Sequence, residues 1–434
     1  NNFIDVSDAS SFSIGDWIQI FQTDTDLVTS TWAYNTVGQI VKISNITGNR
    51  ISLVSALRLN YPLSRSPYIK KITPVENVGI ECIKILRIDD TAPSQTSNVL
   101  FNYAVNSWVE GIESEYCTNS HINAFNSSNL YISKSYFHDA FGHGAGGRAY
   151  GVTLQSTTNE CLVENNSFRR LRHSMLLQSG ANGNVFSYNY STDPYWDDSS
   201  TGVTNSAGDM VLHGNYPYSN LFEQNICRNI VIDNSHGPNG PHNTFLRNRA
   251  EGYGIFFSAS NSPSQNFLGN DITNTSFPYS WVNYSISGAD HFIHGNNNKG
   301  TITPTGTSSL PDESYVYTSK PDFVPTSQWA EIGTPNSLGS GGGPARDRFI
   351  GGNPLENSCI DISVYGENNI IYLSELPVGT TIVKFYNNLG NIVLTESVVD
   401  TNASISIVTL PVGVYTIKFE LNGAVIYEEL LVKL

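Results

Sequence analysis

A six-residue pattern of the form Asn-x-apolar-x-x-Asn recurs along the middle of the chain and constrains its fold more than any other feature. Phe222, Phe245 and Phe267, the apolar residues of three consecutive copies, follow one another at intervals of 23 and 22 residues. The complete copies are NVFSYN (184–189), NLFEQN (220–225) and NTFLRN (243–248). Looser copies are LYISKS (130–135), CLVENN (161–166), QNFLGN (265–270) and HFIHGN (291–296).

This period predicts an all-β solenoid of short strands. It is too short for most helical repeats, and the leucine ladder of leucine-rich repeats is missing. A single coil cannot bury its apolar face alone, so the coils must stack on one another. Strands of neighbouring coils then lie about 4.8 Å apart. The apolar residues form one inward column, and the asparagines ladder their side-chain amides along the stack.

The repeat divides the chain into four regions. Val109, in NSWVEGI, lies 23 residues before Ile132 and extends the column backwards, so the solenoid is assigned to residues 76–300. Residues 1–75 are expected to form an irregular β region. Because the exposed edge strand of the first coil would be prone to aggregation, either this region or a partner is expected to cap it. Residues 301–357 are predicted as an irregular segment with a flexible Gly-rich linker. Residues 358–434 alternate apolar and polar residues, which predicts a small antiparallel β-sandwich of about seven strands.

Composition excludes several classes of protein. The net charge of −15 and the pI of about 4.9 argue against nucleic-acid binding. No apolar run reaches the roughly 18 residues that a membrane helix needs. The 23 Tyr and 20 Phe do not fit a disordered chain. No secretory signal opens the sequence, and Asn1-Asn2-Phe3 is expected to be a processed start.

The repeat region, about residues 75–300, resembles the right-handed parallel β-helix proteins of the pectate-lyase-like superfamily in its coil length and Asn-rich turns. That superfamily contains mainly polysaccharide lyases, glycoside hydrolases, epimerases and tailspikes. The resemblance implies a right-handed parallel β-helix that acts on a carbohydrate.

The C-terminal region resembles the sorting domain of Bacteroidetes proteins that use the type nine secretion system. The resemblance rests on GNIVLTE (Gly390–Glu396), LPVGVYTIKF (Leu410–Phe419) and a final apolar strand with a Lys, Leu430–Leu434. It implies that the type nine machinery of the outer membrane is a partner of residues 358–434. The protein is accordingly expected to be secreted or attached to the cell surface.

The repeat register also aligns polar residues. It sets side by side five short segments, VTLQ (152–155), MLLQ (175–178), MVLH (210–213), IVID (230–233) and IFFS (255–258). Their last residues, Gln155, Gln178, His213, Asp233 and Ser258, would form one outward column with neighbours about 5 Å apart. His213 beside Asp233 is an arrangement typical of acid–base catalysis. The alternative is a polar ladder that faces solvent or a covering loop.

Two insertions interrupt the period and are expected to form loops at the functional surface. The first, about Phe137–Gly151, offers His143 and Arg148 as substrate-binding residues. The second, about Ser191–Met210, offers Tyr195 and Trp196 as platforms for sugar rings. The same insertion contains Asp193, Asp197 and Asp198, whose oxygens suit calcium, the one cofactor that the sequence indicates. The alternative for these aspartates is that they only form turns.

Further ionisable residues lie close to the predicted column in sequence. Arg172 and His173 are candidates for catalysis together with His213, Asp233 and Asp209. Candidates for substrate binding are Gln178, His236, Arg247, Arg249 and Tyr253. A lyase acting on a uronic acid needs a cation near the sugar carboxylate and a base, whereas a hydrolase needs two carboxylates roughly 5–10 Å apart. Asp209 with Asp233, or Asp233 with Glu251, is a candidate pair for hydrolysis.

Two functions remain open from the sequence. The first is an exported polysaccharide lyase or glycoside hydrolase that acts on an acidic glycan. The second is a non-catalytic β-helical surface adhesin or glycan-binding protein. Replacement of His213 by Ala discriminates between them, because an enzyme would lose turnover and keep its fold, whereas a binder would lose nothing.

Overall fold

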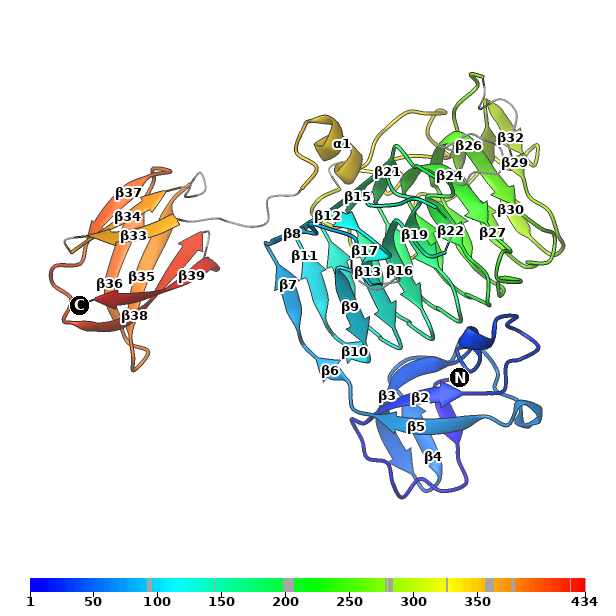
Figure 1. Ribbon diagram of the computed structural model, residues 1–434, viewed down its shortest axis with the longest axis horizontal. Coiled ribbons are helices and arrows are strands. Elements are labelled where there is room, and N and C mark those ends of the chain that lie inside the picture. The colour runs from blue at the N-terminus through cyan, green and yellow to red at the C-terminus, as the bar shows by residue number, and fades with distance from the viewer. Residues whose placement is uncertain are drawn as a thin grey trace. The chain divides into compact units, whose positions relative to one another are not determined.

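Parallel strands that pair from coil to coil form a β-helix over most of the chain in the computed structural model (Figure 1). The chain divides into two units, Asn1–Glu356 and Asn357–Leu434. The structure describes residues 1–91, 96–144, 146–197, 207–277, 279, 284–324, 327–355, 363–367, 369–374, 376, 379–421 and 423–433.

In the part of the chain that the structure describes, one strand of each coil joins a nine-stranded parallel sheet. Its strands are β7 (Gly79–Glu81), β11 (Trp108–Glu110), β14 (Tyr131–Ser133), β17 (Leu162–Glu164), β20 (Val185–Ser187), β23 (Leu221–Glu223), β25 (Thr244–Leu246), β27 (Asn266–Leu268) and β30 (Phe292–His294). Their register pairs the apolar residues of successive coils from Val109 to Ile293. Phe222 and Phe245 are fully buried, and their stacked rings lie 4.9 Å apart. The predicted inward column is confirmed.

The remaining strands of the coils form a second sheet of sixteen strands within the described residues. Its hydrogen-bonded path follows β8 (Lys84–Leu86), β12 (Glu113–Cys117), β15 (Tyr136–Ala140), β18 (Ser167–Arg169), β21 (Tyr190–Thr192), β24 (Ile226–Ile232), β22 (Met210–Leu212), β19 (His173–Leu177), β16 (Tyr150–Gln155), β13 (Ser120–Phe125) and β9 (Val99–Asn102). Off this path lie β26 (Arg249–Phe257), β28 (Asp271–Ile272), β29 (Tyr284–Ser285), β31 (Asn296–Asn298) and β32 (Thr301–Thr303). Both insertions lie within this sheet, between β15 and β16 and between β21 and β22.

Buried asparagines cross-link the coils at a turn. The side-chain amide of each donates to the side-chain oxygen of the next at 2.8–3.1 Å, in the order Asn166, Asn189, Asn225, Asn248, Asn270 and Asn296. Each amide also donates to a backbone carbonyl, as Asn225 does to Phe186 at 2.8 Å. The ladder satisfies polar groups that would otherwise cost free energy inside the solenoid, and it confirms the expected role of the repeated Asn.

The N-terminal region forms an antiparallel sheet with the order β1 (Phe3–Asp5), β4 (Arg50–Leu53), β3 (Gln39–Thr47), β2 (Trp17–Phe21) and β5 (Tyr68–Ile72). It differs from the predicted cap on the first coil, because it binds the turns of later coils. Gln19 donates to Asn126 at 3.1 Å, and Asn182 donates to the carbonyl of Gly38 at 3.0 Å. A short parallel pair, β6 (Val75–Glu76) with β10 (Ala104–Val105), connects the sheet to the first coils.

Residues 301–350, called the strap below, were predicted to be irregular and partly a flexible linker, but they run back along the coils. Ile332 N–H donates to Gln224 at 3.1 Å, and the short helix α1 (Pro344–Ile350) buries Ala345 against Tyr190 and Ile226. Gly341 permits a close approach there, since a Cβ at this position would meet the carbonyl oxygen of Glu331. No helix in the described residues is long and apolar enough to cross a membrane.

The C-terminal unit consists of two antiparallel sheets, as predicted. One has the order β33 (Ser363–Glu367), β34 (Ile370–Ser374) and β37 (Ala403–Ser406). The other has the order β36 (Ile392–Val398), β35 (Thr381–Asn387), β38 (Gly413–Leu421) and β39 (Ala424–Lys433). Ile371 and Ile405 of the first sheet and Phe385 and Phe419 of the second share one buried core, which is the packing of a β-sandwich.

Candidate functional site

The predicted polar column is present at the ends of five neighbouring strands. The register of β16, β19, β22, β24 and β26 places Gln155, Gln178, His213, Asp233 and Ser258 next to one another. Gln178 donates to the side-chain oxygen of Gln155 at 2.6 Å, and Ser258 donates to Asp233 at 3.2 Å. Parallel pairing therefore converts a sequence offset of one coil into direct contact.

His213 and Asp233 lie in hydrogen-bond contact at the centre of this column. Nδ1 of His213 lies 2.5 Å from Oδ2 of Asp233, and the two side chains are 5% and 19% exposed. Burial opposes the charged carboxylate, but the contact with His213 and the hydrogen bond from Ser235 hold the pKa of Asp233 well below its ordinary value. A proton on Nδ1 directed at Asp233 leaves Nε2 of His213 free to accept one.

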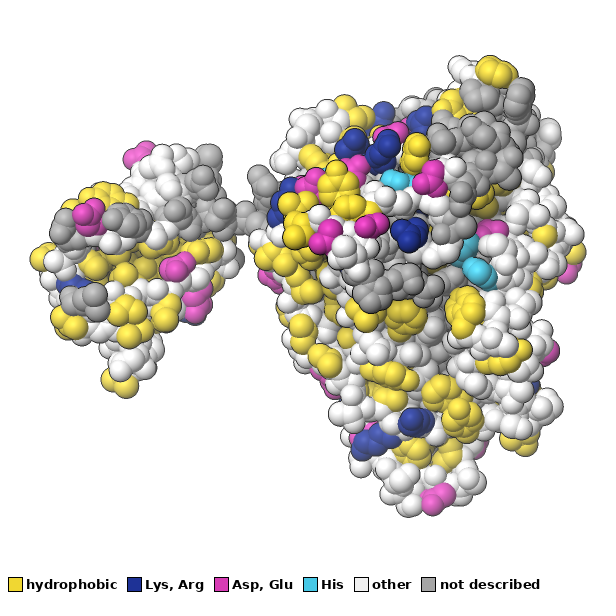
Figure 2. Space-filling model, in the orientation of Figure 1, with side chains coloured by type: hydrophobic (Ala, Val, Ile, Leu, Met, Phe, Trp, Pro, Cys, Tyr) yellow, Lys and Arg dark blue, Asp and Glu magenta, His cyan; other side chains and the backbone are white. Residues whose placement is uncertain are grey.

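Aromatic rings and two further histidines surround this pair. The ring centroids of His173 and His236 lie 5.1 and 4.9 Å from that of His213, and Tyr150 packs edge-on at 6.4 Å. Burial lowers the pKa of His173 well below its ordinary value, and burial also lowers the pKa of His236. On the face drawn in Figure 2, histidine side chains lie among acidic and basic ones on the larger unit.

Arg172 supplies the positive charge beside these rings. Its guanidinium lies 5.8 Å from the ring centroid of Tyr150 and 5.6 Å from that of Trp196. One nitrogen, Nη1, donates to the carbonyl of Gly144 at 2.9 Å. The arrangement links both insertions to the column, because Gly144 belongs to the first and Trp196 to the second.

The two insertions pack against each other, and they hold most of the substrate-binding residues predicted there. The backbone N–H of His143 donates to Asp197 at 3.2 Å, and the ring of Tyr195 packs edge-on against that of His143 at 5.0 Å. Nε2 of His143 donates to the carbonyl of Arg170 at 2.9 Å. Arg148 lies on the first insertion at intermediate exposure. These contacts fix one wall of the site.

Several buried polar atoms of this region lack a hydrogen-bond partner among the described residues. They are Nε2 of His173, Nε of Arg172 and Nε1 of Trp196. The other ring nitrogen of His173, Nδ1, donates to the carbonyl of Gly208 at 2.6 Å, which leaves Nε2 as an acceptor. These atoms belong to side chains in the series of contacts that runs from His213 through His173, Tyr150 and Arg172 to Trp196.

Other predicted site residues lie away from His213 and hold the structure together. Arg247 is 1% exposed and donates to the strap carbonyls of Thr334 at 2.8 Å and Glu313 at 2.9 Å. Arg249 donates to the carbonyl of Gly341 at 3.0 Å. The strap therefore occupies both guanidinium groups, which are not available to a sugar carboxylate. Tyr253 packs on Tyr279, with ring centroids 5.0 Å apart.

Asp209 was predicted to be catalytic, but it is fully buried and bound to backbone. Its two oxygens accept from the N–H groups of Arg228 at 2.8 Å and Asn229 at 2.7 Å. Burial raises the pKa of Asp209 to about 6. The carboxylate thus connects the end of the second insertion to β24.

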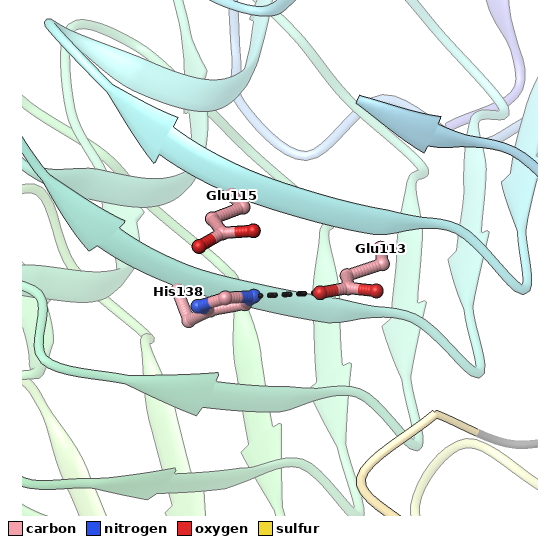
Figure 3. Close-up of side chains that lie close together, drawn as sticks. All are labelled: Glu113, Glu115 and His138. Atoms are coloured by element: carbon pink, nitrogen blue, oxygen red, sulfur yellow. Dashed lines mark hydrogen bonds and ion pairs between the residues drawn. The ribbon is translucent and has the colours of Figure 1, made fainter. Parts of the chain in front are cut away.

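A group with metal-ligand spacing lies elsewhere. Within the described residues, Glu113 and Glu115 of β12 and His138 of β15 form the one such group (Figure 3). Nζ of Lys84 lies 2.9 and 2.8 Å from the two glutamates and already supplies a positive charge there. Asp193 and Asp197 are exposed and do not belong to this group, and Asp198 lies outside the described residues. The calcium site stays a prediction.

Sequence reasoning missed two neighbours of the pair. Tyr150 pairs with His173 in the same parallel register that predicted the column, so extending that alignment to the start of each strand would have found it. Trp32 lies 5.5 Å from His236, measured between ring centroids. No repeat places Trp32, because it belongs to the N-terminal sheet region.

No protein-family model matches the chain, and no curated protein matches it significantly. Three solved structures of phage tailspikes are similar to it. They are gp61 of Pseudomonas phage phi297 (12% identity, TM-score 0.45, 68% of this chain and 45% of that chain), gp49 of Pseudomonas phage LKA1 (12%, 0.32, 67% and 57%), and Gp54 of Acinetobacter baumannii bacteriophage AP22 in complex with A. baumannii capsular saccharide (11%, 0.32, 70% and 63%). The chain thus covers less than two thirds of each of these tailspikes, and its function is inferred from its own site.

Proposed function

We propose that this protein cleaves an acidic polysaccharide by β-elimination at the His213–Asp233 pair. The observation that carries the proposal is the pair itself, 2.5 Å apart and largely buried, with the guanidinium of Arg172 and the open buried nitrogens beside it. An oriented imidazole next to a fixed cation is what abstraction of a proton alpha to a carboxylate requires.

In this reaction His213 is the general base. Asp233 accepts from Nδ1, so Nε2 removes the C5 proton of a uronate ring. The electron pair of that C–H bond becomes the C4–C5 double bond as the bond from C4 to the glycosidic oxygen breaks. The leaving oxygen takes its proton from Tyr150, whose pKa burial raises, which keeps the phenol protonated.

Arg172 binds the carboxylate of the same uronate ring. Nη1 is used by Gly144, so Nε and the remaining terminal nitrogen form the free fork that a carboxylate matches. A cation at this point stabilises the negative charge that develops on the carboxylate after C5 loses its proton. Gln155 and Gln178 lie further along the column, where amides bind sugar hydroxyls.

Hydrolysis is the less favoured chemistry. It needs two carboxylates roughly 5–10 Å apart. Among the described residues, the carboxylate in contact with His213 is that of Asp233. Asp209 is bound to backbone N–H groups in the interior, and Glu251 lies 3.7 Å from Arg228. Neither is free to act as a second catalytic carboxylate.

The proposal is tested on a panel of polygalacturonate, alginate, hyaluronan and chondroitin sulfate, with dextran as the neutral control. Elimination produces ultraviolet absorbance of the unsaturated product together with new reducing ends, and His213→Ala abolishes both while the fold is kept. His242→Ala, an exposed histidine outside the site, is the matched control and keeps full activity. Reducing ends without absorbance would show hydrolysis instead. Binding without either signal would establish the alternative, a non-catalytic glycan-binding surface protein.

We further propose that the C-terminal unit directs export by the type nine secretion machinery and places the protein outside the cell. Its support is the motif resemblance together with a core of its own, formed by residues such as Ile371, Phe385 and Phe419. Fusion of residues 358–434 to a periplasmic reporter in a host with type nine secretion is expected to bring the reporter to the medium or cell surface. Retention of the reporter in the periplasm would refute this role.

A further inference from the structure

The loop before the short 3-10 helix η1 (Thr31–Ala33) is bound to the turns that follow His213 and Asp233. The backbone N–H of Thr29 donates to Asn215 at 3.0 Å, and the hydroxyl of Thr29 donates to the carbonyl of His236 at 2.9 Å. The N-terminal region therefore contributes a second wall of the site. It precedes both insertions in the sequence.

Close approach of this loop depends on a glycine. Gly237 has a φ of +80°, and a Cβ at that position would meet the side chain of Thr29. A side chain there would force the loop away from the column, because neither the conformation nor the space admits one. The turn after Asp233 thus fits the N-terminal loop closely.

Trp32 lies in η1, directly after this loop, and stays half exposed. Its side chain is 51% exposed, while its ring packs edge-on against His236 at 5.5 Å and an interplanar angle of 85°. His236 in turn packs on His213 at 4.9 Å. An indole ring that is held at one edge and open to solvent can stack on a ligand that has an apolar face and polar edges.

Successive rings connect Trp32 with Trp196 across the reacting pair. The centroids of His213 and His173 are 5.1 Å apart, and those of His173 and Tyr150 are also 5.1 Å apart. Arg172 then lies between Tyr150 and Trp196. The base His213 thus lies between two tryptophans that come from different parts of the chain.

We infer that Trp32 forms a separate subsite that stacks a pyranose ring of the same acidic polysaccharide, next to the ring that reacts at His213. The inference rests on the proposed function, since it assigns the neighbouring sugar to that reaction. Trp32 touches neither the proton nor the bond that breaks. It is a positioning residue that holds the polymer in register and favours long substrates over short ones.

The experiment compares Trp32→Ala with Trp32→Phe on the panel polysaccharide that the wild type cleaves fastest. Loss of one stacked sugar is expected to raise KM about tenfold while kcat stays within about twofold. Trp32→Phe restores most of the affinity, because it keeps an aromatic face. Tyr68→Ala is the matched control, since Tyr68 is 52% exposed on the same N-terminal sheet but stacks on Phe21.

A second measurement separates this inference from the proposed function. Binding of the same polysaccharide is measured by calorimetry on His213→Ala with and without Trp32→Ala. Weaker binding of the double variant supports the subsite, and equal binding together with an unchanged KM overturns it while the proposed reaction stands. If the wild type neither cleaves nor binds any acidic polysaccharide of the panel, the proposed function fails, and the subsite fails with it.

Discussion

At the scale of residues, two aspartates of the β-helix have opposite environments. Asp233 lies at the end of a strand and contacts His213, whereas Asp209 is fully buried and accepts from two backbone N–H groups. The pKa of the first is held low and that of the second is raised to about 6. The contacts of Asp233 therefore suit the proposed reaction, whereas those of Asp209 hold backbone N–H groups in the interior.

Asp233→Asn is expected to lower kcat by at least about 100-fold on the acidic polysaccharide, because the amide no longer fixes the tautomer and charge of His213. The side chain keeps its size and its bond from Ser258, so the fold is retained. Initial rates of ultraviolet absorbance measure the effect, with circular dichroism as the control for folding. Activity within a factor of about three of wild type would remove Asp233 from the mechanism.

The pKa of Asp209 predicts a pH dependence of stability. The folded state raises this pKa from 3.8 to about 6, so folding favours the protonated form. The contribution is fully present below pH 3.8 and is lost as the pH rises through about 6, which amounts to roughly 3 kcal/mol of the free energy of unfolding.

Asp209→Asn is expected to flatten this dependence in denaturant titrations between about pH 4 and pH 7. Some slope remains, because burial also raises the pKa of Asp271 to about 6. A variant whose unfolding free energy falls with pH as steeply as that of wild type would contradict the assignment.

At the scale of elements, the solenoid is stabilised by repetition of the same two contacts in successive coils from Phe186 to Phe267. Phenylalanines stack with ring centroids about 5 Å apart, and asparagine amides bond across the coil interface. Neither contact exists within one coil, so a single coil has no core of its own. Both insertions lie outside these contacts, between β15 and β16 and between β21 and β22.

Asn225→Ala is expected to destabilise the larger unit by about 2–4 kcal/mol. It removes the bonds to Asn248 and to the carbonyl of Phe186, and it leaves the amide of Asn189 without its acceptor. Chemical denaturation measures the loss. Asn102→Ala, at an exposed asparagine, serves as the control and changes stability little. Equal stabilities of the two variants would show that the ladder contributes no net free energy.

At the scale of the larger unit, segments outside the repeat cover the coils on more than one side. The N-terminal sheet binds the turns near Asn126, Asn182 and Asn215, and it contributes Trp32 to the site. The strap covers Arg247 and Arg249 and returns toward the earlier coils. The site is thus assembled from the repeat, two insertions and the N-terminal region together.

Arg247→Ala is expected to release the strap. The variant removes bonds from a charged group to the carbonyls of Thr334, Glu313 and Pro311, which amounts to about 3 kcal/mol or more of local stability. Limited proteolysis within residues 301–341 should then accelerate by over about 100-fold. Arg346→Ala, whose guanidinium lies 3.6 Å from the exposed carboxylate of Asp347, is the control. Cleavage at the wild-type rate would refute the anchoring role.

What the sequence by itself determined is the part of the protein that is periodic. A parallel register converts a spacing of one coil into contact, so the column from Val109 to Ile293, the Asn ladder and the His213–Asp233 pair all followed from counting residues. Alternation in the last region likewise predicted its antiparallel sheets, because period two places one face of each strand in a core.

Only the tertiary structure decided the contacts of the segments that have no period. Arg247 and Arg249 were predicted to bind substrate, but the strap that occupies them returns from more than fifty residues later in the chain. Trp32 joins the site from nearly two hundred residues before His213. Such contacts depend on complementary surfaces between segments far apart in the chain, and no regular spacing in the sequence records them.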